Sequence, residues 1–164
     1  MTKLAQLKHP DPMHLEAAAG WIQLGDYDSA NDELEKIRAE WRAHPDVLEL
    51  RWLIYSNDEQ WDACLDIASA IVKMAPDRVW GWIHKAISLR RANGGGFENA
   101  KSLLLEAAKL FPEDGMIQYN LACYCAQLGQ LDAAQEHLDK SYELGDAQKI
   151  KLIALDDDDL KPLW

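Results

Sequence analysis

The sequence predicts an all-α fold, a right-handed α-α superhelix of about four helix hairpins closed by a C-terminal capping helix. Two observations predict it. A short pattern of a bulky residue, an acidic residue and, two positions later, a small residue recurs four times at nearly constant spacing. No stretch shows the strict alternation of apolar and polar residues that is typical of strands. A period near 34 residues is typical of helix–turn–helix repeats, which bury their apolar faces against their neighbours.

The bulky residue of the pattern marks the start of the second helix in each hairpin. It recurs at intervals of 34, 36 and 34 residues, as Tyr27, Trp61, Phe97 and Leu131. An acidic residue follows it each time, in the first turn of a helix, where the macrodipole favours negative charge. The small residue two further on lets the paired helices approach closely; these residues are Ala30, Cys64, Ala100 and Ala134.

Turn and breaker residues delimit the repeats. Gly25 and Gly129 permit tight turns between paired helices, and prolines end the second helices. We expect first helices at about 13–24, 46–57, 79–93 and 115–128, and second helices at about 27–43, 60–75, 97–110 and 131–144. A capping helix at about 147–155 and a short turn complete a single domain over 1–164. Its predicted parts are repeats at about 11–44, 45–78, 79–114 and 115–146, and a cap at 147–164.

The pattern resembles the tetratricopeptide repeat. Ala18, Ala86 and Ala122 hold the small position of the first helix, and Trp82 matches the tryptophan that begins each repeat of that family. The chain departs from the family at Trp52, where a small residue is expected. It departs again at residues 58–59, which replace the turn glycine of the second repeat, and at residues 42–44, which lengthen the first. The end, "ALDDDDLKPLW", resembles the end units of bacterial tetratricopeptide proteins.

The resemblance implies that the first helices line the concave side of the superhelix. Helical spacing then selects the residues on their free faces, which are mostly apolar. The predicted groove residues are Leu15, Ala19, Ile22, Glu49, Leu53, Trp80, Ile83, Ile87, Arg90, Met116, Tyr119 and Cys123. A second apolar face on these helices predicts a groove for a peptide or a helix. Filling of the groove by the chain's own tail, and self-association, are the open alternatives.

A protein or peptide partner is therefore expected, bound by a non-catalytic interaction module. One alternative is a small chaperone for a secreted client, because acidic tetratricopeptide chaperones of type III secretion have a similar size and groove polarity. Another is a structural subunit whose groove is filled by its tail or by a dimer partner. A clamp for a terminal carboxylate is not expected, because the groove positions are apolar apart from the basic pair Arg90 and Arg91.

Charge and cysteine usage restrict the classes of partner and compartment. The net charge is −11, from 17 basic and 28 acidic side chains, and such a surface repels nucleic acid and anionic membranes. No apolar run approaches the roughly 20 residues of a spanning helix, and the first residues carry no signal-peptide pattern. Cys64, Cys123 and Cys125 cannot all pair within one chain, so we expect a reducing cytoplasm.

Three local patterns suggest chemistry and are better explained by structure. Cys123 and Cys125 point about 200° apart on a helix, so they cannot share a metal with His137. The acidic run 156–159 lacks the alternating ligands and glycine of a calcium loop. The glycines at 94–96 are not followed by the Gly-Lys-Ser/Thr of a phosphate-binding loop. The sequence therefore predicts no metal, no cofactor and no enzymatic activity.

Overall fold

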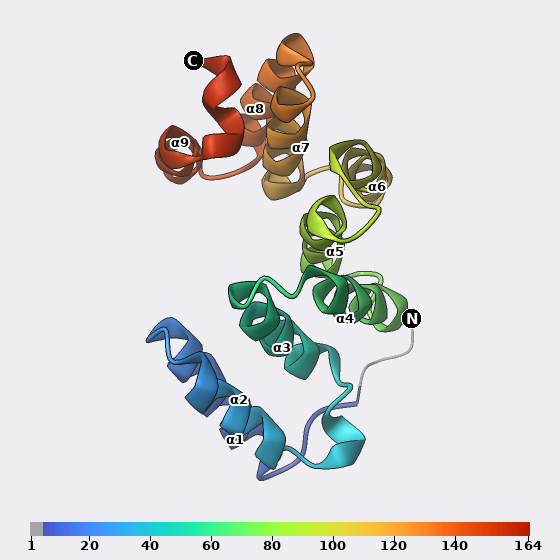
Figure 1. The fold of residues 1–164 in the computed structure, drawn as a ribbon, viewed down its shortest axis with the longest axis vertical. Helices are drawn as coiled ribbons and strands as arrows, with labels where there is room; N and C mark the ends of the chain where they lie inside the picture. The colour runs from blue at the N-terminus through green and yellow to red at the C-terminus, as the bar shows by residue number, and fades with distance from the viewer. Residues whose placement is uncertain (1–4) are drawn as a thin grey trace. The chain divides into compact units, whose positions relative to one another are not determined.

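The computed structural model describes residues 5–164, which form helices, turns and short connections with no strand, and it confirms the all-α prediction (Figure 1). The α-helices are α1 (Asp11–Gln23), α2 (Tyr27–Lys36), α3 (Pro45–Asn57), α4 (Trp61–Met74), α5 (Val79–Arg91), α6 (Phe97–Leu110), α7 (Gly115–Gln127), α8 (Leu131–Leu144) and α9 (Ala147–Asp156). Two 3₁₀ segments, η1 (Ala39–Trp41) and η2 (Asp158–Leu163), complete the described part of the chain. The predicted helices correspond to α1–α9 in order, and one of them differs substantially in length.

The chain divides into two compact units within α5. The first unit ends at His84 and the second begins at Lys85. The first contains α1 to α4 and the start of α5, and the second contains the rest of α5 and α6 to η2. The prediction of a single domain over 1–164 stays a prediction.

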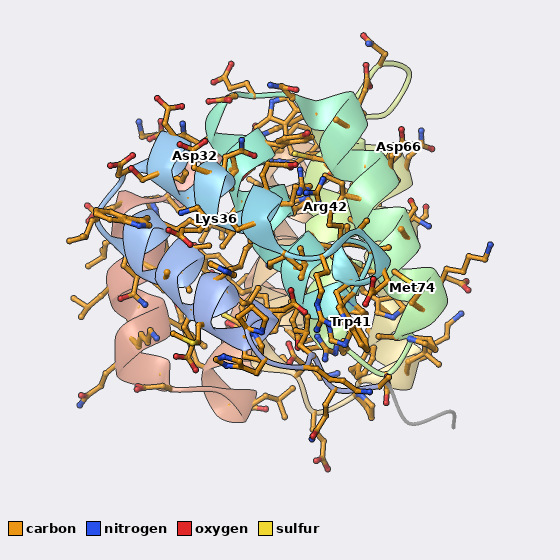
Figure 2. All side chains as sticks on the ribbon, turned by 90° about the horizontal axis from the view of Figure 1, so that it is seen from below. Asp32, Lys36, Trp41, Arg42, Asp66 and Met74 are labelled. Atoms are coloured by element: carbon orange, nitrogen blue, oxygen red, sulfur yellow. The ribbon has the colours of Figure 1, made fainter. Side chains whose placement is uncertain are left out.

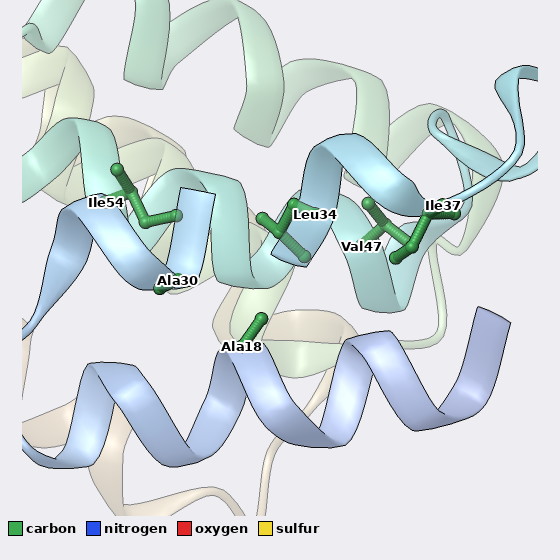
Figure 3. Packing of buried hydrophobic residues seen from close by; sticks show 6 residues of the cluster. All are labelled: Ala18, Ala30, Leu34, Ile37, Val47 and Ile54. Atoms are coloured by element: carbon green, nitrogen blue, oxygen red, sulfur yellow. The ribbon is translucent and has the colours of Figure 1, made fainter. Parts of the chain in front are cut away.

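The core of the first unit forms where α1, α2 and α3 meet. Its buried side chains are Ala18, Ala30, Leu34, Ile37, Val47 and Ile54 (Figure 3). Ala18 on α1 and Ala30 on α2 are both fully buried at the small positions of the repeat. Their size permits close helix packing, and each larger aliphatic side chain adds roughly 1.5–3 kcal/mol by leaving water.

The second helix of the first repeat ends at Lys36, which corrects the predicted range of 27–43. The backbone turns extended at Ile37, which places that side chain in the core. Arg38 then donates from its main-chain N–H to Asp11 Oδ1 at 3.0 Å and from Nη2 to Asp11 Oδ2 at 2.6 Å. Arg42, labelled in Figure 2 beyond the end of α2, donates from Nε to the Ile37 carbonyl at 2.9 Å. These contacts replace the helical hydrogen bonds that a longer α2 would make.

Trp52 at the small position of the second repeat is accommodated by stacking. Its ring lies parallel to the imidazole of His84 on α5, with 3.9 Å between ring centroids and 5° between planes. The Trp52 side chain is buried in this arrangement. The large side chain at this position is therefore accommodated because it stacks on His84 in the next hairpin.

The turn between α3 and α4 adopts the glycine conformation without a glycine. Glu59 has a φ of 56°, close to the 76° of Gly25 and the 73° of Gly129 in the equivalent turns. A side-chain-bearing residue in this region costs about 1 kcal/mol relative to glycine. The longer loop before α6 requires glycine for another reason, because a Cβ on Gly95 would lie 1.7 Å from the Leu89 carbonyl oxygen.

The core of the second unit surrounds α7, which contacts α6, α8 and η2. Ten of its thirteen residues are buried, including the predicted small position Ala122. Asp114 caps this helix by accepting from the Ile117 N–H at 2.9 Å. The capping helix α9 follows α8 and is itself capped by Asp146, as the predicted range 147–155 anticipates.

The first and last repeats each have a polar contact between the same two positions of the hairpin. His14 on α1 bonds Glu33 on α2 at 2.8 Å, and Gln118 on α7 bonds His137 on α8, also at 2.8 Å. Both pairs are separated by 19 residues and join the same positions of their hairpins. In the two middle repeats these positions carry apolar residues, namely Leu48 and Ile67, and Trp82 and Leu103.

Candidate functional site

The predicted groove residues of the first unit lie on α1, α3 and α5. Leu15 and Ile22 are half-buried and pack against the core, and Leu53 is also half-buried. Trp80 is 50% exposed, and its ring is tilted against His84 with 6.0 Å between ring centroids. We call the predicted apolar groove residues of this unit the open face: Leu15, Ala19, Ile22, Leu53 and Trp80. The sixth predicted residue, Glu49 on α3, is half-buried.

Acidic side chains border the open face. Arg78, before α5, bonds Asp46 and Glu49 on α3 through Nη1, the second at 3.2 Å. An open hollow of about 340 Å³ lies here, lined among others by Leu15, Asp46 and Arg78. The chain before α1 also lines it, where His44 Nε2 and the Ala5 carbonyl oxygen are 3.0 Å apart. The first unit carries 15 acidic against 8 basic side chains, so its net charge is negative.

Two predicted groove residues of the second unit, Tyr119 and Cys123 on α7, contact the end of the chain. The Tyr119 hydroxyl donates to Asp157 Oδ2 at 2.6 Å, and the Cys123 thiol lies 3.6 Å from the same oxygen. Gln127 Nε2 donates to the main-chain carbonyl of Asp159 at 2.9 Å. We call residues 157–164 the tail, and its contacts with α7 close the face that the sequence predicted as a groove.

Arg90 at the end of α5 holds the tail through an ion pair with Asp159. Its Nη1 donates to Asp159 Oδ2, and its side chain is 11% exposed. The guanidinium carbon lies 5.3 Å from the Phe97 ring centroid and 5.6 Å from that of Tyr124, within the range of cation–π attraction. The buried Arg90 Nε has no hydrogen-bond acceptor within the described residues. One donor of the arginine is thus left unsatisfied by the tail.

The apolar part of this cover is thin. Leu160 is fully buried, whereas Leu163 is half-buried and Trp164 is 64% exposed. In α9 the buried side chains are Ile150 and Ala154. Burying one leucine contributes about 1.5–3 kcal/mol, and a charged hydrogen bond adds about 1.5–3 kcal/mol. The tail is therefore held by a few contacts of moderate strength.

Burial keeps the nucleophilic groups of this region protonated. Desolvation raises the pKa of Cys123 and of Tyr119 well above their usual values, and the hydrogen bond that Tyr119 donates to Asp157 raises the pKa of Tyr119 further. Cys125 is buried and its pKa is also raised, chiefly by desolvation. Burial raises the pKa of the Cys64 thiol to about 11. A buried neutral thiol is a poor nucleophile and metal ligand, so these groups act as packing and hydrogen-bonding elements.

The structure places the twelve predicted groove residues in three environments. The first-unit residues other than Ile83 are half-buried or exposed, as are Ile87, Arg90 and Met116. Tyr119 and Cys123 are buried and contact the tail instead of facing an open groove. Ile83 is 1% exposed, which removes it from any surface that a partner contacts.

The tail ligands are the functional residues that sequence reasoning missed. Asp157 and Asp159 were expected to cap a helix or to lie in a solvated turn. Asp157 does cap η2 by accepting from the Asp159 N–H at 2.9 Å, but both carboxylates also bind the groove face. Their neighbours Asp156 and Asp158 are exposed.

Metal-binding and membrane-spanning features are absent from the part of the chain that the structure describes. Among residues 5–164, no group of three or more His, Cys, Asp or Glu side chains is arranged to hold a metal ion. Over the same residues, none of the helices combines the length and apolar character that crossing a bilayer requires.

Comparison with solved structures identifies the repeat type. A thermophilic TPR protein of Thermus thermophilus, TTC0263, superposes with a TM-score of 0.76 at 21% identity, over 86% of this chain and 77% of that one. MamA of Desulfovibrio magneticus RS-1 gives a TM-score of 0.67 at 15% identity, over 96% of this chain and 91% of the other. Yeast Tom70 gives 0.71 at 19% identity, over 90% of this chain and 32% of Tom70.

These likenesses confirm the tetratricopeptide-type helical repeat fold that the sequence resembles. No protein-family model matches the chain, and no curated protein matches it in sequence. Since a fold of this kind serves many functions, the surfaces themselves carry the functional information.

Proposed function

We propose that this protein is a non-catalytic interaction module that binds a peptide or helix of a partner protein on the open face of the first unit. The observation that carries this proposal is Trp80, a large aromatic side chain that is 50% exposed and lies beside His84. Aromatic residues are enriched in binding hot spots, where one side chain often dominates the affinity. The tetratricopeptide-type fold of the chain supports a role in protein binding.

Charge further restricts the partner. The acidic side chains of Asp46 and Glu49 border the open face, and acidic residues outnumber basic ones in the first unit. Complementary charge steers association and suppresses wrong partners. We therefore expect a segment that combines apolar side chains with flanking lysine or arginine. Its uptake should weaken as salt concentration rises.

The test compares two tryptophans two residues apart on α5. Trp82 is half-buried and donates from Nε1 to the Pro76 carbonyl at 3.0 Å, whereas Trp80 is exposed. Proteins captured by the full-length wild type from its native cells are identified, and their affinity is measured with each variant. Trp80→Ala should weaken binding by about 2 kcal/mol, roughly 30-fold, with little change in melting temperature.

Trp82→Ala is the matched control. It should lower stability by about 3 kcal/mol, because a packed aromatic side chain is lost, and it should leave the affinity of the remaining folded protein unchanged. If Trp80→Ala melts as badly as Trp82→Ala and the folded fraction binds normally, the open face is not the binding surface.

A second candidate function is favoured by one observation, the tail on α7. A structural subunit whose groove is filled by its own tail would use the second unit as a closed end of the repeat array. In that case no variant of the open face changes capture, and the captured proteins contact other surfaces. The chaperone alternative and the cytoplasmic location stay predictions.

A further inference from the structure

We propose that the tail is a built-in competitor for a second binding site, on the face of α7, whose external ligand is an acidic partner segment of the pattern Asp-x-Asp-Leu. This proposal rests on the function proposed above, since it adds a second site to an interaction module. The ligand of this second site is acidic, whereas the ligand proposed for the open face of the first unit carries lysine or arginine.

The receptor groups are matched to two carboxylates. Tyr119 and Cys123 on α7 both direct a donor at Asp157, and Arg90 donates to Asp159. The next residue of the tail, Leu160, is fully buried. Two carboxylates two residues apart and an apolar side chain after them are thus recognised together. The amide of Gln127 holds the main chain at Asp159.

The tail is an incomplete ligand for this receptor. A carboxylate that approaches arginine side-on accepts from Nε and one terminal nitrogen together. Asp159 accepts from Nη1, and the buried Nε of Arg90 has no acceptor among the described residues. A pocket of about 580 Å³, lined by Arg90, Arg91, Ile153 and the acidic residues 156–159, lies beside it. A partner carboxylate in bidentate geometry would satisfy the donor that the tail leaves unpaired.

The tail competes because it is tethered, not because it binds strongly. A short connection gives a tethered ligand an effective concentration in the millimolar range. An external segment must therefore bind better than the tail or arrive when the tail is weakened. Asp158 and Trp164 are exposed, and Leu160 is the fully buried apolar side chain of the tail. The tail can therefore dissociate from α7 with the loss of little buried apolar surface.

The experiment measures binding of a synthetic peptide with the sequence of residues 155–164 to the full-length protein by fluorescence anisotropy. Asp157→Asn/Asp159→Asn weakens the tail in the protein, and this variant should bind the peptide at least tenfold more tightly than wild type. The matched control is Glu136→Gln/Glu143→Gln, which removes the same charge at exposed positions of α8 outside the pocket beside Arg90 and should bind as wild type does. The peptide that carries asparagine at 157 and 159 should bind at least tenfold less tightly than the unmodified peptide.

A second measurement does not depend on a folded variant. Millimolar peptide added to wild type should increase amide hydrogen exchange in residues 158–163, because the displaced tail loses its protection. Equal affinities for the two protein variants, or unchanged exchange in the tail, would overturn the proposal. A dimer with exchanged tails in analytical ultracentrifugation would also overturn it, since the occupant would be a second copy. None of these results alters the Trp80 test, which concerns the first unit.

Discussion

The helices α1 and α7 hold the same place in the first and last repeats and have the same length of 13 residues, yet they are buried to very different extents. In α1 the buried residues are Asp11 and Ala18, whereas α7 buries ten. Both helices pack against a partner in their own hairpin through a small alanine and a polar pair at equivalent positions. Part of the difference lies in the hairpin itself, because α2 has 10 residues and α8 has 14. The rest arises outside the hairpin, because α7 also contacts α6 and η2.

On α7 that difference comes from neighbours on several sides, including the tail. Tyr119 and Cys123 of α7, which would line a groove, contact Asp157, and η2 packs against α7. On α1 the equivalent side chains Leu15, Ala19 and Ile22 remain half-buried. One repeat pattern thus gives an uncovered face in the first repeat and a covered face in the last, where the tail contacts α7. Four measurements sharpen or break this comparison.

The largest effect is expected when the cover of α7 is removed. Ending the chain after Gly145 deletes the buried side chains of Ile150 and Leu160, so the free energy of unfolding should fall by about 3–6 kcal/mol. Urea unfolding measures it. Full-length Leu152→Ser/Leu155→Ser, at two exposed positions of α9, is the control and should change stability by less than about 0.5 kcal/mol. Equal midpoints for the truncated and complete chains would show that the tail is not a cover.

A pH effect is expected in the first unit. Burial lowers the pKa of His84 from its ordinary value of 6.5 to about 4. The unfolded chain then binds the proton more tightly than the folded one, so stability falls as pH decreases from about 6.5 to about 4. Between pH 7 and pH 5 the wild type should lose roughly 2 kcal/mol more than His84→Phe, which keeps the stack on Trp52. Parallel losses in the two proteins would contradict this.

A smaller effect is expected at the ion pair between the ends of the first hairpin. The side-chain hydrogen bond from Arg38 holds the pKa of Asp11 below its usual range. Asp11→Asn should lower the melting temperature by several degrees at pH 7. Stability from this carboxylate is lost as pH falls through its lowered pKa, so the two proteins should converge in acid. Glu40→Gln, at an exposed residue 3.7 Å from Arg38, should melt as wild type does. A pH-independent difference would contradict this.

The smallest effect is expected from one hydroxyl under the tail. Tyr119→Phe removes the donor to Asp157 and keeps the buried ring, so unfolding should cost about 1 kcal/mol less. Amide exchange in η2 should rise with it, since the tail loses one of its attachments. A variant with wild-type stability and unchanged exchange in η2 would show that this hydrogen bond does not hold the tail.

The sequence predicted the hairpins well because each depends on local signals. The bulky residue, the acid after it and the small residue fix where a second helix starts and which face it buries, as Ala18 and Ala30 in the core show. The second repeat, in which residues 58–59 replace the turn glycine, keeps the same turn, because Glu59 adopts the backbone conformation of that glycine. These features need no knowledge of distant residues.

Two features escaped prediction because they join residues far apart in the sequence. The end of α2 depends on Arg38 reaching Asp11, 27 residues earlier, which helical periodicity does not encode. The closing of the last groove depends on which two of four consecutive aspartates bond Tyr119 on α7 and Arg90 on α5. Four identical residues in a row give no pattern that indicates which two contact the groove. The sequence therefore could not decide between a groove open to a partner and a groove filled by the tail.

The contact between Arg38 and Asp11 also has a consequence for how the first hairpin opens. Arg38 donates to the Lys8 carbonyl at 3.0 Å as well as to the Asp11 carboxylate, so it ties the beginning of α1 to the end of α2. Helix ends normally fray independently, each by losing its own terminal turn. Here the unwinding of either end breaks the same set of hydrogen bonds. The two helices consequently share one opening event, and the first hairpin behaves as a single cooperative element.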